Sequence, residues 1–135
     1  MASDLQPSAA LRALLDAKLD TLEKLELALA LQDAPGLAAS VDDLALHLQV
    51  GREVLRQVAA EVTRTGLFEI HDEAIQLRAD AEEAALLDEA KELYHHDRHA
   101  MLRLLSAVAM ERIRRRGAMT FADAFKLKTK DRDRG

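Results

Sequence analysis

Four side chains that can bind metal recur at helical spacing in the second half of the chain. Glu92, His95, His96 and His99 place one carboxylate and three imidazoles on one face of a helix, and zinc accepts both ligand types. Their order differs from the His-Glu-x-x-His run of metalloproteases, and their face lies opposite the apolar stripe around Tyr94. We favour a plain polar surface and expect no metal; a zinc site and a pH-sensitive surface are the alternatives.

Patterns that support catalysis are missing from the sequence. There is no Ser-His-Asp arrangement, no glycine loop that cradles phosphate and no pair of carboxylates with a plausible cleft, and the five glycines are scattered. The chain has no cysteine, so disulfide and thiolate chemistry are excluded. We therefore expect no enzyme, no catalytic residue and no cofactor.

Length and charge indicate one domain, residues 1–135, with an acidic body and a basic end. The net charge is −5, but residues 111–135 carry nine Lys or Arg against four acids, so the preceding 110 residues sum to −10. No apolar run approaches the roughly 18 residues that span a bilayer, and the N-terminus lacks the pattern of a signal peptide. We expect a cytoplasmic protein that contacts no membrane.

The hydrophobic pattern divides the chain into helices and one pair of strands. A leucine stripe predicts an N-terminal helix over 8–31, ended by Ala34-Pro35-Gly36. Ser40 is typical of an N-cap, and two short helices follow, the second over 52–65 with Gly66 as its cap. Alternation over 67–70 and 74–78 predicts two strands around His71-Asp72-Glu73.

A long helical pattern continues over 80–116, and we expect it to bend near 96–98 and to stop at Gly117. Residues 117–135 then form a short docking segment with Phe121 and Phe125, followed by a basic tail. Asp97 falls near the apolar stripe of this helix. It either marks the bend, which we favour, or makes a buried contact with Arg98 or Arg112 of a partner that sets dimer register.

The region 40–79 resembles the winged helix-turn-helix of bacterial transcription regulators, most closely MarR-like and related dimeric families. The resemblance rests on Leu44-Ala45-x-x-Leu48-x-Val50, Val62 and Gly66-Leu67, without a gap. It covers about 40 residues. It implies a mainly α fold with a small two-stranded β-wing, framed by long N- and C-terminal helices. Because apolar stripes on a short chain would otherwise stay partly exposed, we expect those terminal helices to form a homodimer.

The resemblance also implies which residues meet DNA. The second helix of the motif would enter the major groove, with Arg52 and Arg56 on guanine edges or phosphate, Gln57 on adenine and Arg64 on the backbone. The wing tip His71-Asp72-Glu73 departs from the basic tip usual in the family and would repel phosphate. Residues 40–79 carry four Arg against seven acids, a net charge of −3.

Cations near the C-terminus offer a further contact. These cations are Arg114, Arg115, Arg116, Lys126, Lys128 and Lys130. They would bind nucleic acid or an acidic partner, or else form a solvated helix end. The first functional hypothesis is a homodimeric transcriptional regulator that binds double-stranded DNA. The alternative is a winged-helix adaptor that contacts another protein without sequence-specific DNA binding.

Overall fold

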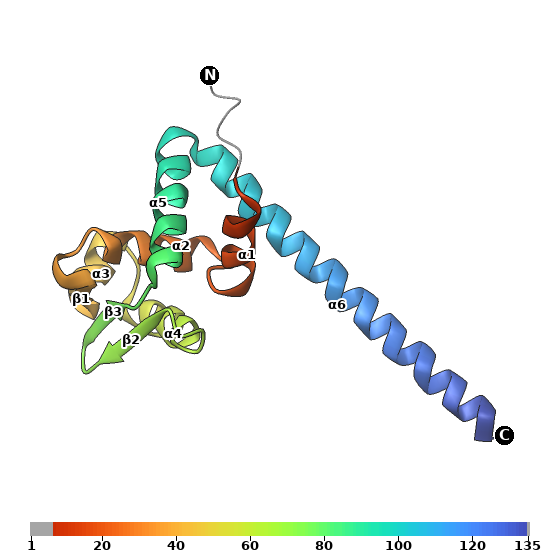
Figure 1. Cartoon of the computed structure of the whole chain (residues 1–135). Coiled ribbons are helices and arrows are strands. Elements are labelled where there is room, and N and C mark those ends of the chain that lie inside the picture. Colours follow the sequence, from red (N-terminus) through yellow and green to blue (C-terminus); the bar gives the residue numbers. More distant parts are fainter. Residues whose placement is uncertain (1–6, 135) are drawn as a thin grey trace.

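The chain folds into a mainly helical structure with a small three-stranded antiparallel sheet (Figure 1). The structure is a computed structural model, which describes residues 7–134 and the side chains of residues 7–118. The elements in chain order are α1 (Ala9–Ala17), α2 (Leu22–Gln32), η2 (Pro35–Leu37), β1 (Ala38–Ser40), α3 (Val41–Leu48), α4 (Arg52–Thr63), β2 (Phe68–His71), β3 (Ala74–Leu77), α5 (Ala81–His96) and α6 (Arg98–Arg134).

The N-terminal helix expected over 8–31 is wrong, because two helices occupy this stretch. Ser8 caps α1 as its side chain accepts a hydrogen bond from the backbone of Leu11 at 3.1 Å. The chain then turns, Leu19 is fully buried, and Thr21 accepts from the backbone of Lys24 at 3.3 Å to begin α2. The turn contains neither Gly nor Pro, so a Thr cap and a buried Leu end one helix and start the next.

The break also changes which leucines are buried. Leu25 and Leu27 in α2 are fully buried, whereas Leu22 and Leu29, which one continuous helix over 8–31 would place on the same face as Leu11 and Leu15, are only partly buried. A helix that restarts after a turn has a new rotational phase, so a stripe extrapolated from α1 no longer marks the inner face of α2.

The sheet has three strands in the order β1-β3-β2, so the expectation of two strands is wrong. The predicted hairpin exists, with Phe68 opposite Leu77 and Ile70 opposite Ile75. On the other edge of β3, Ala39 of β1 also lies opposite Ile75. Strand β1 is only three residues long and lacks an alternating apolar pattern, which is why the sequence did not indicate it.

The helix pair α3 and α4 follows the sequence prediction closely. The Ser40 side chain accepts from the backbone of Asp43 at 3.1 Å and begins α3. Gln49 ends it in the left-handed conformation, with φ of 56°, and Gly51 precedes α4. After α4, Gly66 adopts φ of 82°, a value that glycine reaches without steric cost, and turns the chain into β2.

The bend expected near 96–98 is confirmed at Asp97, which separates α5 from α6. The Asp97 side chain is exposed and accepts a hydrogen bond from the backbone of Ala100 at 3.0 Å, at the start of α6. A contact with an arginine of a partner that sets dimer register stays a prediction. The expected stop at Gly117 is wrong, because α6 continues to Arg134. Glycine costs a helix interior only about 1 kcal/mol, and Gly117 does not adopt a positive φ.

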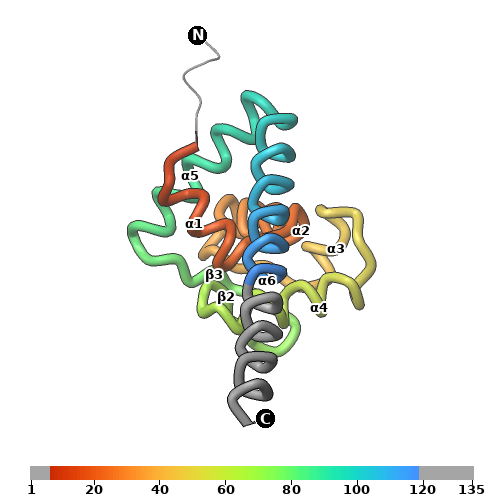
Figure 2. The backbone as a smooth tube through the Cα atoms, turned by 90° about the vertical axis from the view of Figure 1, so that its right-hand side faces the viewer, coloured from red at the N-terminus to blue at the C-terminus, as the bar shows by residue number. Residues whose placement is uncertain are grey.

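The core is aliphatic and centres on α2. Figure 2 shows α2 in the middle of the fold, and it packs against α3, α4, α5 and β3. Among the side chains that the structure describes, Phe68 is the one buried aromatic residue, and no charged or polar residue is buried. The stability of the fold therefore rests mainly on close packing of leucine side chains.

The apolar stripes of the terminal helices are used inside one chain. Leu11 and Leu15 of α1 and Met101 of α6 are all fully buried, and α1 packs against α5 and α6. The exposed-stripe argument for a homodimer is therefore not supported. Met110 and Ile113 on α6 remain 53% and 65% exposed and are still free to meet a partner.

Leu27→Ala should lower the free energy of unfolding by about 2–5 kcal/mol, because it opens a cavity at the centre of α2. Chemical denaturation with far-UV circular dichroism measures the change. Leu46→Ala is the matched control, since Leu46 is 81% exposed on α3, and its effect should stay within about 0.5 kcal/mol. A loss at position 27 no larger than that of the control would contradict the central role of α2.

Candidate nucleic-acid interface

One side of α4 faces solvent along its whole length. Leu55, Ala59 and Val62 attach the helix to the core. On the opposite side Arg52 and Gln57 are exposed, and the terminal helices do not cover them. This surface is the one that the sequence analysis predicted to meet DNA, and two of its arginines, Arg52 and Arg56, already have partners within the chain.

Arg52 stands at the first turn of α4 and contacts α3. Its Nε lies 2.7 Å from a carboxylate oxygen of Asp42, and both side chains are about 60% exposed. Asp42 belongs to the first turn of α3, where a negative charge is favoured by the helix dipole. The guanidinium is thus partly neutralised, but it remains accessible to water and to a competing anion.

Arg56 lies one turn further along α4 and links the helix to the hairpin. Its guanidinium nitrogens lie 3.1 Å from Glu53 on the same helix and 3.0 Å from Glu73 in the turn between β2 and β3. The hydrogen bond and charge of Glu73, followed by the smaller effect of Glu53, raise the pKa of Arg56 above its usual value. The hairpin turn therefore presents a carboxylate to the central arginine of α4.

The other two predicted contact residues are unpaired within the described part of the chain. Gln57 and Arg64 are exposed, and the side chain of neither makes a hydrogen bond or an ion pair with another described residue. Arg64 follows the last turn of α4, so it stands at the far end of this surface from Arg52. The structure places all four predicted residues on one helix or its cap, with free polar groups on two of them.

The hairpin carries charge pairs of its own. Arg78 lies 3.0 Å from Glu69, and the Nε2 atom of His71 lies 2.8 Å from the same carboxylate. The hydrogen bond from Arg78 and then that from His71 lower the pKa of Glu69 below its usual value. Asp72 and Glu73 at the tip remain exposed, so the hairpin offers a DNA phosphate little positive charge.

The predicted tail contacts lie on a different element. Arg114, Arg115 and Arg116 are exposed on α6, and Arg115 lies 2.7 Å from Asp16 of α1. The side chains of Lys126, Lys128 and Lys130 lie outside the described residues. The structure therefore does not bring the described tail arginines onto the surface of α4.

The histidine face of α5 and α6 is solvent-exposed. His95, His96 and His99 are all exposed, and the closest ionic contact is 4.0 Å between His96 and Glu92. Among residues with described side chains, no three potential ligands are placed to share a metal ion. The polar-surface interpretation of this face agrees with that exposure.

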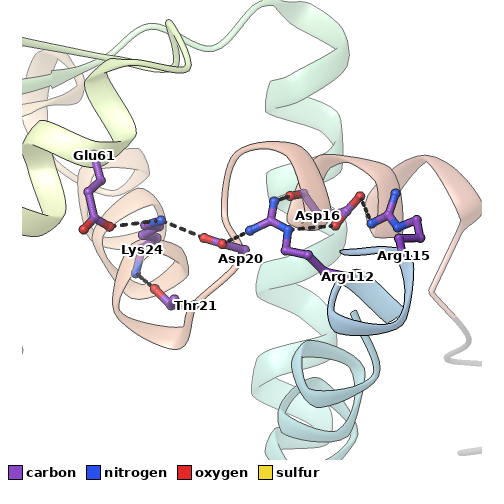
Figure 3. Close-up of polar contacts among 7 residues, drawn as sticks. All are labelled: Asp16, Asp20, Thr21, Lys24, Glu61, Arg112 and Arg115. Carbon is purple, nitrogen blue, oxygen red and sulfur yellow. Dashed lines mark hydrogen bonds and ion pairs between the residues drawn. The ribbon is translucent and has the colours of Figure 1, made fainter. Parts of the chain in front are cut away.

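Six charged residues form a line from α4 to α6 that the sequence did not reveal. Figure 3 shows Glu61 of α4, then Lys24 and Asp20, then Arg112, Asp16 and Arg115. Lys24 lies 3.2 Å from Glu61 and 2.7 Å from Asp20. Arg112 bridges to Asp20 and to the backbone carbonyl of Asp16. We refer to these six residues as the ion chain; it ties α4 and α6 to the turn between α1 and α2.

The ion chain changes the titration of its central pair. Burial opposes ionisation of Asp20, but the hydrogen bond and charge of Lys24 and the charge of Arg112 outweigh it, so the pKa of Asp20 is lowered. Burial likewise opposes the charge on Lys24, yet contacts with Asp20 and Glu61 raise its pKa. A spacing of four residues between Asp20 and Lys24 was the one signal in the sequence for this network.

Comparisons with known proteins leave the chain unassigned. No family model matches the sequence, no curated protein matches it, and no solved structure matches its fold. Within the described residues, none of the helices combines the length and the apolar character required to cross a bilayer. The surface of α4 and its neighbours therefore remain the candidate functional site.

Asp20 should contribute stability above its unfolded pKa of about 3.8, and this contribution should disappear as the pH falls through the lowered folded value. Urea unfolding at several pH values measures it. Asp20→Asn should reduce stability at neutral pH and flatten the acid part of the profile. Asp88→Asn removes an exposed carboxylate outside the ion chain and should keep the wild-type slope; equal slopes in all three proteins would rule out this role for Asp20.

Proposed function

We propose that the chain is a winged-helix transcriptional regulator that works in the cytoplasm and binds duplex DNA as a homodimer through the outer face of α4. The observation that carries the proposal is that Arg52, Arg56 and Gln57 are exposed together on a helix that the terminal helices leave uncovered. The order of two short helices and a hairpin is the order that a winged helix has.

The chemistry of these side chains suits a base edge and a phosphate. A guanidinium near the start of the inserted helix donates two hydrogen bonds to guanine or neutralises a phosphate, and a glutamine amide pairs with adenine. Arg64, at the far end of α4, contacts only the sugar-phosphate backbone of the DNA. Two copies held at a fixed spacing read two half-sites, and the spacing selects which sites bind.

The carboxylates of Asp42, Glu53 and Glu73 set the strength of this interaction. Each holds an arginine that DNA would use, so phosphate must replace a carboxylate rather than meet a free cation. Exposed ion pairs add little net stability and yield to a competing anion. Residues 40–79 also carry a net charge of −3. The affinity for DNA is therefore weak and falls steeply as the salt concentration rises.

The second candidate function is that of an adaptor that binds a basic protein. It is favoured by the same pairing, because the arginines are already neutralised while Asp72 and Asp43 remain exposed. An adaptor of this kind would use the acidic hairpin tip and the start of α3 and would not need Arg52 or Arg56. The two functions thus differ in which residues they require.

Arg52→Ala/Arg56→Ala should weaken binding to random duplex DNA about tenfold or more and should reduce the salt slope, because each phosphate contact contributes about 0.9 to that slope. Glu53→Gln/Glu73→Gln should tighten binding several-fold, since it frees Arg56. Fluorescence anisotropy at about 50 mM and about 200 mM salt measures both effects. Arg12→Ala/Arg103→Ala removes the same charge from α1 and α6 and serves as the matched control.

The DNA proposal fails if neither the wild type nor Glu53→Gln/Glu73→Gln binds duplex at the lower salt. It also fails if binding occurs but the α4 and control variants lose the same affinity, since the loss would then reflect the overall charge of the protein and not the surface of α4. Binding of a basic protein that survives Arg52→Ala/Arg56→Ala would favour the adaptor.

A further inference from the structure

A hollow of about 210 Å³ lies between α4 and the hairpin of β2 and β3. Its apolar lining comes from Val41, Ala59, Ile70 and Ile75, of which three are buried and Ile70 is 40% exposed. An apolar cavity of about 150 Å³ can hold a benzene ring, so this hollow has room for one aliphatic or aromatic side chain. We call it the hairpin hollow.

The rim of the hairpin hollow is acidic. Asp72 and Glu73 form the turn between β2 and β3, and both line the hollow. Arg56 lines it as well, but its guanidinium is held by Glu53 at 3.1 Å and by Glu73 at 3.0 Å. The Asp72 side chain is exposed and makes no hydrogen bond or ion pair with another described residue. Three carboxylates thus stand beside one cation, which favours a positively charged partner.

Strand β2 borders the hollow and is an edge of the sheet, because the strand order is β1-β3-β2. His71 lies opposite Ala74 across a two-residue turn, and the N–H of Arg78 donates to the carbonyl of Leu67 at 2.7 Å. Hydrogen-bonded pairs alternate with non-hydrogen-bonded pairs along antiparallel strands, so the N–H and C=O of Ile70 point away from β3. They make no hydrogen bond with another part of the described chain. The edge is therefore open to a further strand.

A strand added at this edge would bring the hollow into use. A residue opposite Ile70 directs its side chain to the same face of the sheet as Ile70, which is the face that lines the hollow. The residue two positions further along, on the same face, lies beside the hairpin turn and Asp72. In recognition of this kind, main-chain hydrogen bonds supply affinity and a pocket for one side chain supplies specificity. The occupant that fits is an extended segment with one apolar side chain and a Lys or Arg two positions away.

We infer that the hairpin hollow and the outer edge of β2 form a docking site for an extended basic segment of another protein. The segment adds a strand beside β2, inserts one apolar side chain next to Ile70 and places a cation on Asp72. The inference rests on the second candidate function, the binding of a basic protein, and it depends neither on DNA binding nor on a dimer. It uses the acidic turn that opposes the binding of DNA.

The isoleucines of the chain report on this site. The sequence has three; Ile70 and Ile75 line the hairpin hollow, and Ile113 is 65% exposed on α6. The probe is a capped peptide, Thr-Lys-Thr-Leu-Thr-Lys-Thr, added to the full chain with isotope-labelled isoleucine methyl groups. In NMR spectra the signals of Ile70 and Ile75 should shift and that of Ile113 should not. The concentration dependence of the shifts gives the dissociation constant.

Three altered peptides separate the contributions. Replacement of the Leu by Ser removes the apolar anchor and should weaken binding about tenfold or more. N-methylation of the same Leu keeps its side chain but removes the main-chain donor that pairs with Ile70, and it should weaken binding several-fold. Replacement of both Lys by Glu should abolish detectable binding, because like charges then meet at Asp72 and Glu73.

Variants of the protein place the contact on the hairpin. Ile70→Lys puts a cation into the wall of the hollow and should weaken binding, followed at Ile75, about tenfold or more. Ile113→Lys makes the same change on α6 and should leave binding unchanged. Asp72→Asn removes a charge and should weaken binding about twofold to fivefold; Asn tolerates the left-handed conformation that Asp72 adopts at φ of 55°. Circular dichroism confirms that each variant is folded.

Each contrary outcome identifies what is wrong. If the Leu peptide shifts neither Ile70 nor Ile75 at millimolar concentration, or if the Ser peptide binds equally well, the docking site is overturned. If the Leu peptide binds Ile70→Lys as tightly as the wild type, the basic segment uses another surface; the adaptor function then stands and this site does not. If random duplex DNA shifts Ile70 and the peptide does not, the hollow belongs to a DNA surface and the docking site is overturned.

Discussion

The burial of α2 is the constraint on which the other elements depend. Leu25, Leu27, Ala28 and Leu31 are fully buried, and this one helix packs against α3, α4, α5 and a strand. Close packing of the leucine side chains sets most of the arrangement of these helices, and polar contacts at the edges add directional constraints between them. The ion chain from Glu61 to Arg115 does this for α4, the α1–α2 turn and α6.

On the surface of α4, the exposed position of the helix and the charges around it have opposite effects on the binding of an anion. A helix presented like a recognition helix carries arginines, but the first turn of α3, α4 itself and the hairpin turn each contribute a carboxylate to them. Under the proposed function, the backbone arrangement presents these arginines to nucleic acid, whereas the paired carboxylates weaken that interaction. Affinity in such a case is set by the difference between phosphate and carboxylate as partners for one guanidinium, rather than by the number of arginines.

Local chemistry made α3, α4 and the hairpin predictable, because the Ser40 side chain caps α3 and Gly66 turns the chain at a positive φ between α4 and β2. The break between α1 and α2 was not predictable from spacing, since leucines continue on both sides and no Gly or Pro intervenes. Among the partners of Arg56, Glu53 follows from helical spacing, whereas Glu73 is brought close only by the tertiary fold.

One residue already described gives the molecule an optical reporter. The sequence has a single Tyr and no Trp, and Tyr94 lies where α5 meets α2, next to Glu26 and with the Arg98 guanidinium 5.8 Å from its ring centre. Its burial, and then the nearby charge of Glu26, raise the pKa of its hydroxyl. Emission excited in the tyrosine absorption band, where phenylalanine does not absorb, therefore comes from one phenol at one helix junction, and quenching or recovery of that emission follows movement there.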